Sequence, residues 1–229
     1  AIAFSSVQMM RNLNFWKKIE DTAQPITNIK VSHGTIERGP ASATLQFNNA
    51  DIEESPMAQM LEDRFLRQCL IQKIKENNLI DLIEQRKIIE IDDLNKQKQL
   101  TLDNSSKMKA SLIVASDGIN SPTAKAFGIK KAGWKYKQCG LVCAVNHSYS
   151  SNNTAYQYFL PEGPLAILPI KNNTASIVWT ESTQNASTIS EMDDLEYLSV
   201  LQNRFGDFLG KLKLTGKRLS FPLKLSISE

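Results

Sequence analysis

Four short apolar segments in series, separated by strong turn signals, constrain the fold of this chain more than any other feature. The segments are rich in β-branched and aromatic residues and cover residues 141–145, 155–160, 165–170 and 175–180. Between them stand Asn152-Asn153, Pro161–Pro164 and Asn172-Asn173. Strands that follow one another at such short intervals usually pair with their neighbours. This part of the chain therefore predicts an antiparallel sheet.

The half of the chain before Gly128 has a different pattern, in which helical and strand signals alternate. Apolar residues recur at helical spacing between Leu61 and Ile74 and predict a helix over residues 57–77. Leu112–Ala115 is a short apolar run before a turn, which is typical of a strand buried on both faces of a parallel sheet. In the second half, Ser190 predicts the start of a helix that reaches about residue 208. The whole pattern predicts a mixed α/β fold of two interleaved modules.

Charge and composition exclude several classes of protein. Hydrophobic residues make up 41% of the 229 residues, and no apolar run is long enough for a membrane-spanning helix. The net charge of +3 gives no electrostatic case for a nucleic-acid partner. The densest basic cluster comprises Lys130, Lys131, Lys135 and Lys137. It predicts either a solvated loop or a weak contact with anionic lipid.

Cysteine usage and the chain ends give two further expectations. The three cysteines, Cys69, Cys139 and Cys143, cannot all pair, which favours reduced thiols and a cytoplasmic location, and they predict no metal site. The chain begins without Met and stops inside a segment with strand character. We therefore expect an internal fragment of a longer protein.

The motif with the clearest chemistry is Asp117-Gly118, which follows the run Leu112–Ala115 after one intervening residue, Ser116. Ser121-Pro122 then has the residues that start a helix. A carboxylate and a glycine backbone at the carboxyl end of a strand lie where open α/β sheets bind ligands. The carboxylate can accept hydrogen bonds from ribose hydroxyls, and the glycine allows close approach. An ordinary Asp-Gly turn is the alternative.

Residues 114–121, VASDGINS, resemble the internal Asp-Gly motif of the class A flavin monooxygenases, the p-hydroxybenzoate hydroxylase superfamily. Further segments, in matching order, resemble the ubiquinone-biosynthesis hydroxylases of that class: residues 1–16, 61–70, 163–170, 176–179 and 216–223. The resemblance implies part of an FAD-binding Rossmann-like domain interleaved with an antiparallel substrate domain. It places residues 1–24 and 50–130 in the FAD-binding domain. Residues 25–49 become a strand pair of the substrate domain, and residues 131–229 form the rest of it.

The same resemblance implies a function for a full-length protein. It is that of an FAD-dependent monooxygenase of ubiquinone biosynthesis, which uses NAD(P)H and O2 to hydroxylate a polyprenyl phenol through a flavin hydroperoxide. Peripheral association with the inner membrane face or with a biosynthetic complex is implied by such a substrate. The glycine-rich FAD motif of the family does not occur in the sequence, so this piece alone is expected to be inactive. A non-catalytic scaffold that retains the substrate domain, or another flavoprotein of the same fold, remains an alternative.

The resemblance also assigns residues to a cofactor site. Asp117, Gly118, Ser121 and Arg64 are expected to contact FAD. For Arg64 the alternative is an ion pair on the helix surface with Glu62 or Asp63.

The substrate is expected to lie against Leu165, Ile167 and Trp179, for which burial in the core is the alternative. No catalytic side chain is expected, because the flavin carries the chemistry. His33 and His147 are accordingly predicted to be structural or exposed.

Overall fold

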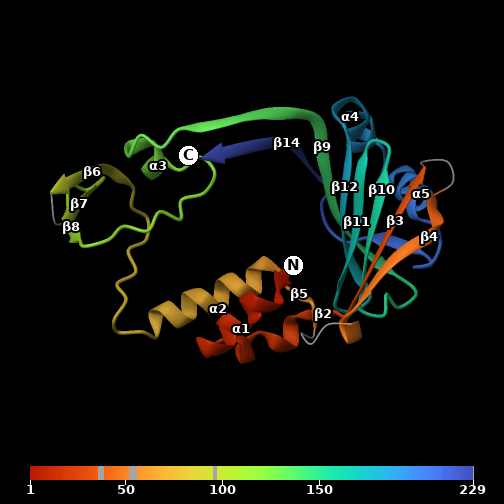
Figure 1. Cartoon of the computed structure of the whole chain (residues 1–229), viewed down its shortest axis with the longest axis horizontal. Coiled ribbons are helices and arrows are strands. Elements are labelled where there is room, and N and C mark those ends of the chain that lie inside the picture. The colour runs from red at the N-terminus through yellow and green to blue at the C-terminus, as the bar shows by residue number, and fades with distance from the viewer. Residues whose placement is uncertain (36–38, 52–55, 95–96, 229) are drawn as a thin grey trace. The chain divides into compact units, whose positions relative to one another are not determined.

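The computed structural model describes residues 1–35, 39–51, 56–94 and 97–228. Its contacts divide the chain into two compact units (Figure 1). The first comprises Ala1–Lys73 and Tyr136–Leu223, and the second comprises Ile74–Lys135 and Lys224–Glu229. Their boundaries differ from those of the predicted domains, so the assignment of segments to an FAD-binding domain remains a prediction.

An eight-stranded sheet forms the centre of the first unit. Its strands are β3 (Asn28–Thr35), β4 (Gly39–Asn48), β9 (Lys131–His147), β10 (Thr154–Leu160), β11 (Gly163–Ile170), β12 (Thr174–Ser182), β13 (Leu212–Leu214) and β14 (Leu219–Ser228). They lie in the order β13–β9–β12–β11–β10–β3–β4, and β14 also pairs with β9. The antiparallel arrangement predicted for residues 141–180 is confirmed.

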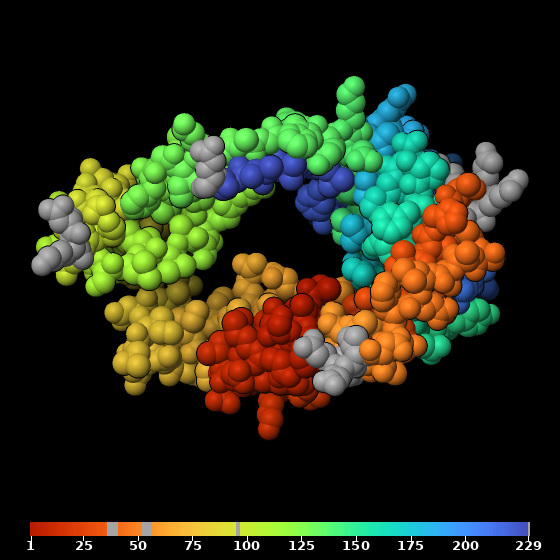
Figure 2. All heavy atoms as spheres, viewed as in Figure 1, coloured from red at the N-terminus to blue at the C-terminus, as the bar shows by residue number. Residues whose placement is uncertain are grey.

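The turns of this sheet follow from their residues. Asn152, Asn153, Asn172 and Asn173 all have positive φ. Asparagine tolerates this left-handed conformation, which the tight turns of hairpins require. One pairing differs from the predicted antiparallel pattern. Strand β3 lies parallel to β10, with Asn28 beside Thr154. Figure 2 shows the residues of β3 and β4 in orange against the turquoise residues of the later strands.

Two helices cover one face of the sheet and bury its apolar residues. They are α4 (Thr183–Glu191) and α5 (Asp194–Phe205), where a single helix over residues 190–208 was predicted. The difference arises at Asp193, whose carboxylate accepts hydrogen bonds from the N–H groups of Leu195 and Glu196 and so caps α5. Tyr197, Leu201 and Phe205 of α5 pack into the core beneath the sheet.

A smaller cluster in the first unit surrounds the N-terminal helix. It contains β1 (Ile2–Ala3), β2 (Gln24–Ile26) and β5 (Ala58–Met60), which form a three-stranded sheet, together with α1 (Phe4–Asn12) and α2 (Asp63–Lys75). The helix predicted over residues 57–77 is thus shorter, because its first residues form β5 and hydrogen-bond to two other strands. None of the described helices is long and apolar enough to cross a membrane.

The second unit holds a three-stranded sheet and a short helix. These are β6 (Ile88–Leu94), β7 (Gln97–Leu102), β8 (Lys107–Ala110) and α3 (Pro122–Ala126). The prediction of a buried strand at Leu112–Ala115 is wrong for this structure: Leu112 is 76% exposed and Val114 78% exposed. Its apolar residues favour a strand, but no described strand lies beside them to complete a hydrogen-bonded ladder.

Candidate cofactor and substrate sites

The Asp-Gly motif forms a tight turn that orients its carboxylate. Gly118 has a φ of +83°, a conformation that glycine adopts without strain. The N–H of Ser121 donates to the carbonyl of Gly118 at 3.0 Å and closes the turn. The Ser121 hydroxyl accepts a hydrogen bond from the N–H of Ala124 at 2.9 Å and caps α3, as predicted for a helix start at Ser121-Pro122.

Asp117 is held in its charged form by the start of this helix. Hydrogen bonds from the side chain of Ser121 and then from the side chain and backbone of Thr123 lower the pKa of Asp117 to about 2. The Thr123 N–H lies 3.0 Å from Oδ2 of the carboxylate. Thr123 did not stand out in the sequence. The sequence does contain a signal for this contact: an acidic residue lies shortly before a Ser-Pro helix start. The free N–H groups in the first turn of a helix attract a carboxylate.

A cavity of about 540 Å³ lies beside this turn within the second unit. Asp117, Gly118 and Ser121 all line it, so the structure brings these three predicted residues together. Much of the remaining wall is apolar: Leu112, Ile113, Phe127 and Ile129. Two lysines also border the cavity, but Lys98 pairs with Asp93 and Lys131 donates to the carbonyl of Ile119.

These groups suit hydroxyl recognition better than phosphate binding. The exposed Asp117 carboxylate can accept further hydrogen bonds beyond those from Ser121 and Thr123, and apolar residues surround it. The two bordering lysines are already engaged. The residues present therefore fit the hydroxyl-bearing part of a nucleotide cofactor, and the structure gives no reason to place a pyrophosphate here.

Arg64 lies on α2 of the first unit and is engaged with its neighbours. Its Nη2 lies 3.0 Å from Oε2 of Glu62, and its guanidinium is 4.7 Å from the centre of the Phe65 ring. This is the ion pair that the alternative predicted. Contact of Arg64 with FAD remains a prediction.

The side chains predicted to line the substrate site lie instead in the core. Leu165 and Trp179 are fully buried, and Ile167 is 1% exposed. All three belong to the apolar cluster packed against α4 and α5. Because side chains alternate between the faces of a strand, their immediate neighbours point the other way. The structure thus places these three residues where the alternative predicts, in the core, and their contact with a substrate remains a prediction.

The opposite face of the sheet is largely open. One row crosses six strands in register and comprises Leu45, Val31, Gln157, Ala166, Val178 and Val142. We call this row the open face. Leu45 is 60% exposed, Val178 is 37% exposed, and the other four are half-buried. The neighbouring row is partly covered, because Ala155 packs against Ile26 of β2 and Met60 of β5.

The remaining predicted features lie at ordinary positions. His33 is exposed, and the buried His147 places Nδ1 2.6 Å from the carbonyl oxygen of Tyr149. All three cysteines are buried and free. Among the described residues, no group of three His, Cys, Asp or Glu side chains could hold a metal ion.

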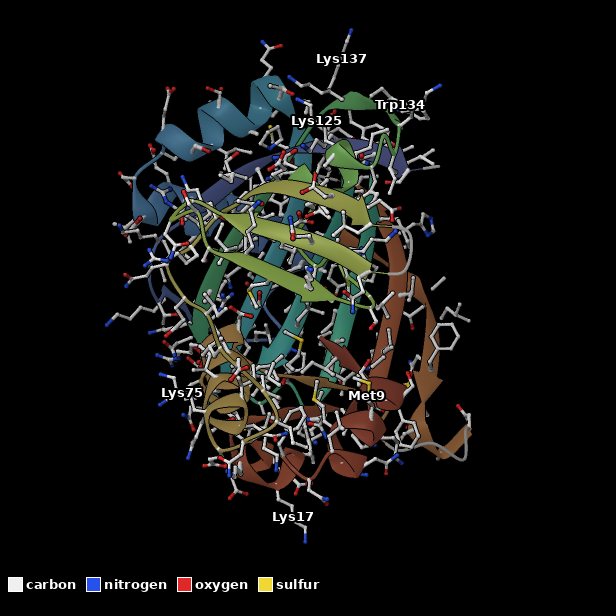
Figure 3. All side chains as sticks on the ribbon, turned by 90° about the vertical axis from the view of Figure 1, so that its left-hand side faces the viewer. Met9, Lys17, Lys75, Lys125, Trp134 and Lys137 are labelled. Carbon is white, nitrogen blue, oxygen red and sulfur yellow. The ribbon has the colours of Figure 1, made fainter. Side chains whose placement is uncertain are left out.

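The basic cluster is solvated, since its four lysines are exposed. Figure 3 shows the side chains of Lys125 and Trp134, both in the second unit, at the surface, and Trp134 is 58% exposed. Contact of this region with anionic lipid remains a prediction.

Comparison with known proteins shows which class this architecture belongs to. No family profile matches the sequence. A probable FAD-dependent monooxygenase, PqsL from Pseudomonas aeruginosa, superposes with a TM-score of 0.75 over 94% of this chain and 62% of its own, at 14% identity. The flavin-dependent monooxygenase PieE, solved with FAD and substrate, gives a TM-score of 0.72 over 99% of this chain and 43% of its own, at 11% identity. The fold is that of the class A flavin monooxygenases.

Sequence relatives narrow the class to a family. The ubiquinone hydroxylase UbiL of Rhodospirillum rubrum is 29% identical over 98% of this chain and 51% of its own length. The ubiquinone biosynthesis monooxygenase COQ6 of Dictyostelium discoideum is 26% identical over 87% of this chain and 45% of its own. The chain is thus similar to ubiquinone-biosynthesis hydroxylases over most of its length, in keeping with the resemblance of its motifs. It spans about half the length of the curated relatives it matches.

Proposed function

We propose that this chain is part of an FAD-dependent enzyme that hydroxylates the aromatic ring of a polyprenyl phenol in ubiquinone biosynthesis. The observation that carries the proposal is the match to a ubiquinone hydroxylase over 98% of the chain. It is supported by an ordered Asp-Gly turn beside a cavity. The narrower assignment to 2-polyprenyl-6-methoxyphenol hydroxylase is favoured by the motifs and belongs to this proposal.

The cavity of the second unit is where we expect FAD to contact this chain. FAD, reduced by NAD(P)H, supplies the reaction with O2 that delivers one oxygen atom to the ring. The chain itself contributes recognition: Asp117, kept charged by Ser121 and Thr123, accepts hydrogen bonds from cofactor hydroxyls. The space beside Gly118 is open to a ligand, since a Cβ atom placed on this residue would lie more than 4 Å from every other heavy atom considered.

The open face is where we expect the substrate to lie. Five of its six residues are apolar, and an aromatic ring with an isoprenoid tail gains affinity by covering such a surface. A tail of this kind partitions into lipid, so association with a membrane surface or a biosynthetic complex forms part of the proposal.

Flavin content of the full-length protein tests the function. The full-length protein is expected to purify yellow, and a prenylated phenol is expected to stimulate its oxidation of NAD(P)H. A colourless protein that cannot be reconstituted with FAD would contradict the proposal and favour a non-catalytic scaffold.

The Asp117→Ala variant tests the cofactor site. Because a hydrogen bond to a charged group typically contributes about 1.5–3 kcal/mol, the dissociation constant for FAD should rise by roughly 10–150-fold. Asp103→Ala is the matched control, since Asp103 is exposed in the same unit and does not line the cavity. Equal FAD affinity in both variants would remove Asp117 from the site.

A further inference from the structure

Gln157 stands out on the open face because of its position and its chemistry. It lies on β10 near the middle of the row, between Val31 of β3 and Ala166 of β11. Of the six residues that make up this row, only Gln157 has a polar side chain. An amide placed among valine, leucine and alanine side chains must give up much of its hydration when a ligand covers the face.

The Gln157 amide has no hydrogen-bond partner among the described residues, although its side chain is half-buried. Three other half-buried glutamines of the first unit are paired, whereas Gln8 on α1, like Gln157, has no partner in the described part of the chain. Gln24 donates to the Asn153 side chain, and Gln138 donates to the carbonyl of Glu162. Gln202 donates to Asp207. The amide of Gln157 therefore retains its full capacity to bind a ligand.

The surroundings of Gln157 also leave room for an aromatic ring. Ala166, directly across from it on β11, has the smallest side chain of the row, and Val178 follows on β12. A ring lying over Ala166 would contact Val178 on one side and bring a ring hydroxyl next to the Gln157 amide on the other. A glutamine amide both donates and accepts, so it can bind a phenol hydroxyl as either partner.

We propose that Gln157 is a specificity-determining residue, whose amide hydrogen-bonds the ring hydroxyl of the phenol and so sets the orientation of the ring on the open face. This inference rests on the proposed function for the nature of the ligand. A site that hydrogen-bonds a substrate hydroxyl discriminates strongly against the analogue that lacks it, because its buried polar group is then left unpaired.

Binding of two ligands to the full-length protein tests the inference without requiring turnover. The probes are 2-prenylphenol and prenylbenzene, which differ by the hydroxyl, and isothermal calorimetry measures their affinities. Gln157→Leu is expected to weaken binding of 2-prenylphenol by about 10–100-fold and to leave binding of prenylbenzene unchanged or stronger. Gln157→Glu, which can still accept a hydrogen bond, is expected to retain a preference for the phenol.

Gln46→Leu is the matched control, because Gln46 is an exposed glutamine of β4 at a register position paired with Lys30, on the face opposite Gln157. It should change neither affinity. Equal weakening for both probes in Gln157→Leu, no weakening for either, or no binding of 2-prenylphenol to the unsubstituted protein would overturn the inference. Absence of FAD from the full-length protein would instead refute the proposed function. The absorption spectrum of the purified protein measures FAD content independently of the binding experiment.

Discussion

Replacing Arg204 by methionine tests how the helix-covered face of the sheet is held together. Arg204 on α5 is 9% exposed, and its Nη2 lies 3.0 Å from Oε1 of Glu181, which is 1% exposed. Its guanidinium also lies 4.2 Å from the centre of the Trp179 ring. Glu181 accepts two further hydrogen bonds, from Nε1 of Trp179 at 3.0 Å and from Nδ2 of Asn185 at 3.2 Å.

Methionine keeps much of the apolar contact with Trp179 but leaves the Glu181 carboxylate buried without its cation. Loss of one partner of a buried ion pair costs about 3–5 kcal/mol. We expect the lower end, about 3 kcal/mol, because the donors of Trp179 and Asn185 remain. For a chain of this size that corresponds to a melting temperature lower by about 6–12 °C. Urea unfolding followed by near-ultraviolet circular dichroism measures the change as a shift of the midpoint at constant slope.

Two further variants separate the buried charge from general damage. Arg67→Met removes an exposed ion pair, in which Nη2 of Arg67 lies 2.8 Å from Oδ2 of Asp63. This variant should shift the unfolding midpoint little. The double variant Glu181→Gln with Arg204→Met should recover most of the lost stability, because no buried charge remains. If Arg204→Met and Arg67→Met shift the midpoint equally, the reasoning about the buried pair is refuted.

Two other predictions address the faces of the sheet and the Asp-Gly turn. Leu165→Ala should cost about 2–5 kcal/mol of unfolding free energy, whereas Val178→Ala on the open face should cost less than about 1 kcal/mol; similar losses in chemical denaturation would show that the two faces were wrongly assigned. Because hydrogen bonds lower the pKa of Asp117 from 3.8 to about 2, the stability they give the folded turn is complete above pH 3.8 and is lost as the pH falls through 2. Carbon-13 NMR of the carboxyl group follows this titration, and a midpoint near pH 3.8 would contradict it.

Local patterns in the sequence predicted the strands of the sheet but not its open face. The alternation from Leu165 to Ile170 and the asparagine turns are set by neighbouring residues, and both were recognised. Which side of β11 would be covered depends on α4 and α5, which pack there only after the chain folds back. The residues predicted to line a substrate wall, Leu165, Ile167 and Trp179, therefore lie on the covered side, one position away from Ala166 and Val178 on the open face.

The cofactor site shows the same limit. The turn at Asp117-Gly118 and the helix cap at Ser121 could be predicted because both are local features, while contact of these residues with FAD remains a prediction. The exposure of Leu112 and Val114 could not be predicted in this way, because burial of a strand depends on partner strands that a single apolar run does not specify.

The parallel pairing of β3 with β10 has a consequence for synthesis on the ribosome. β3 and β4 emerge early as an isolated two-stranded hairpin, a structure that is marginally stable by itself in water. The edge that β3 later gives to β10 stays vacant until the chain has been made as far as Leu160. During that interval the nascent hairpin presents unpaired backbone groups to other proteins. We therefore expect a chaperone to protect the chain most effectively before β10 has been synthesised.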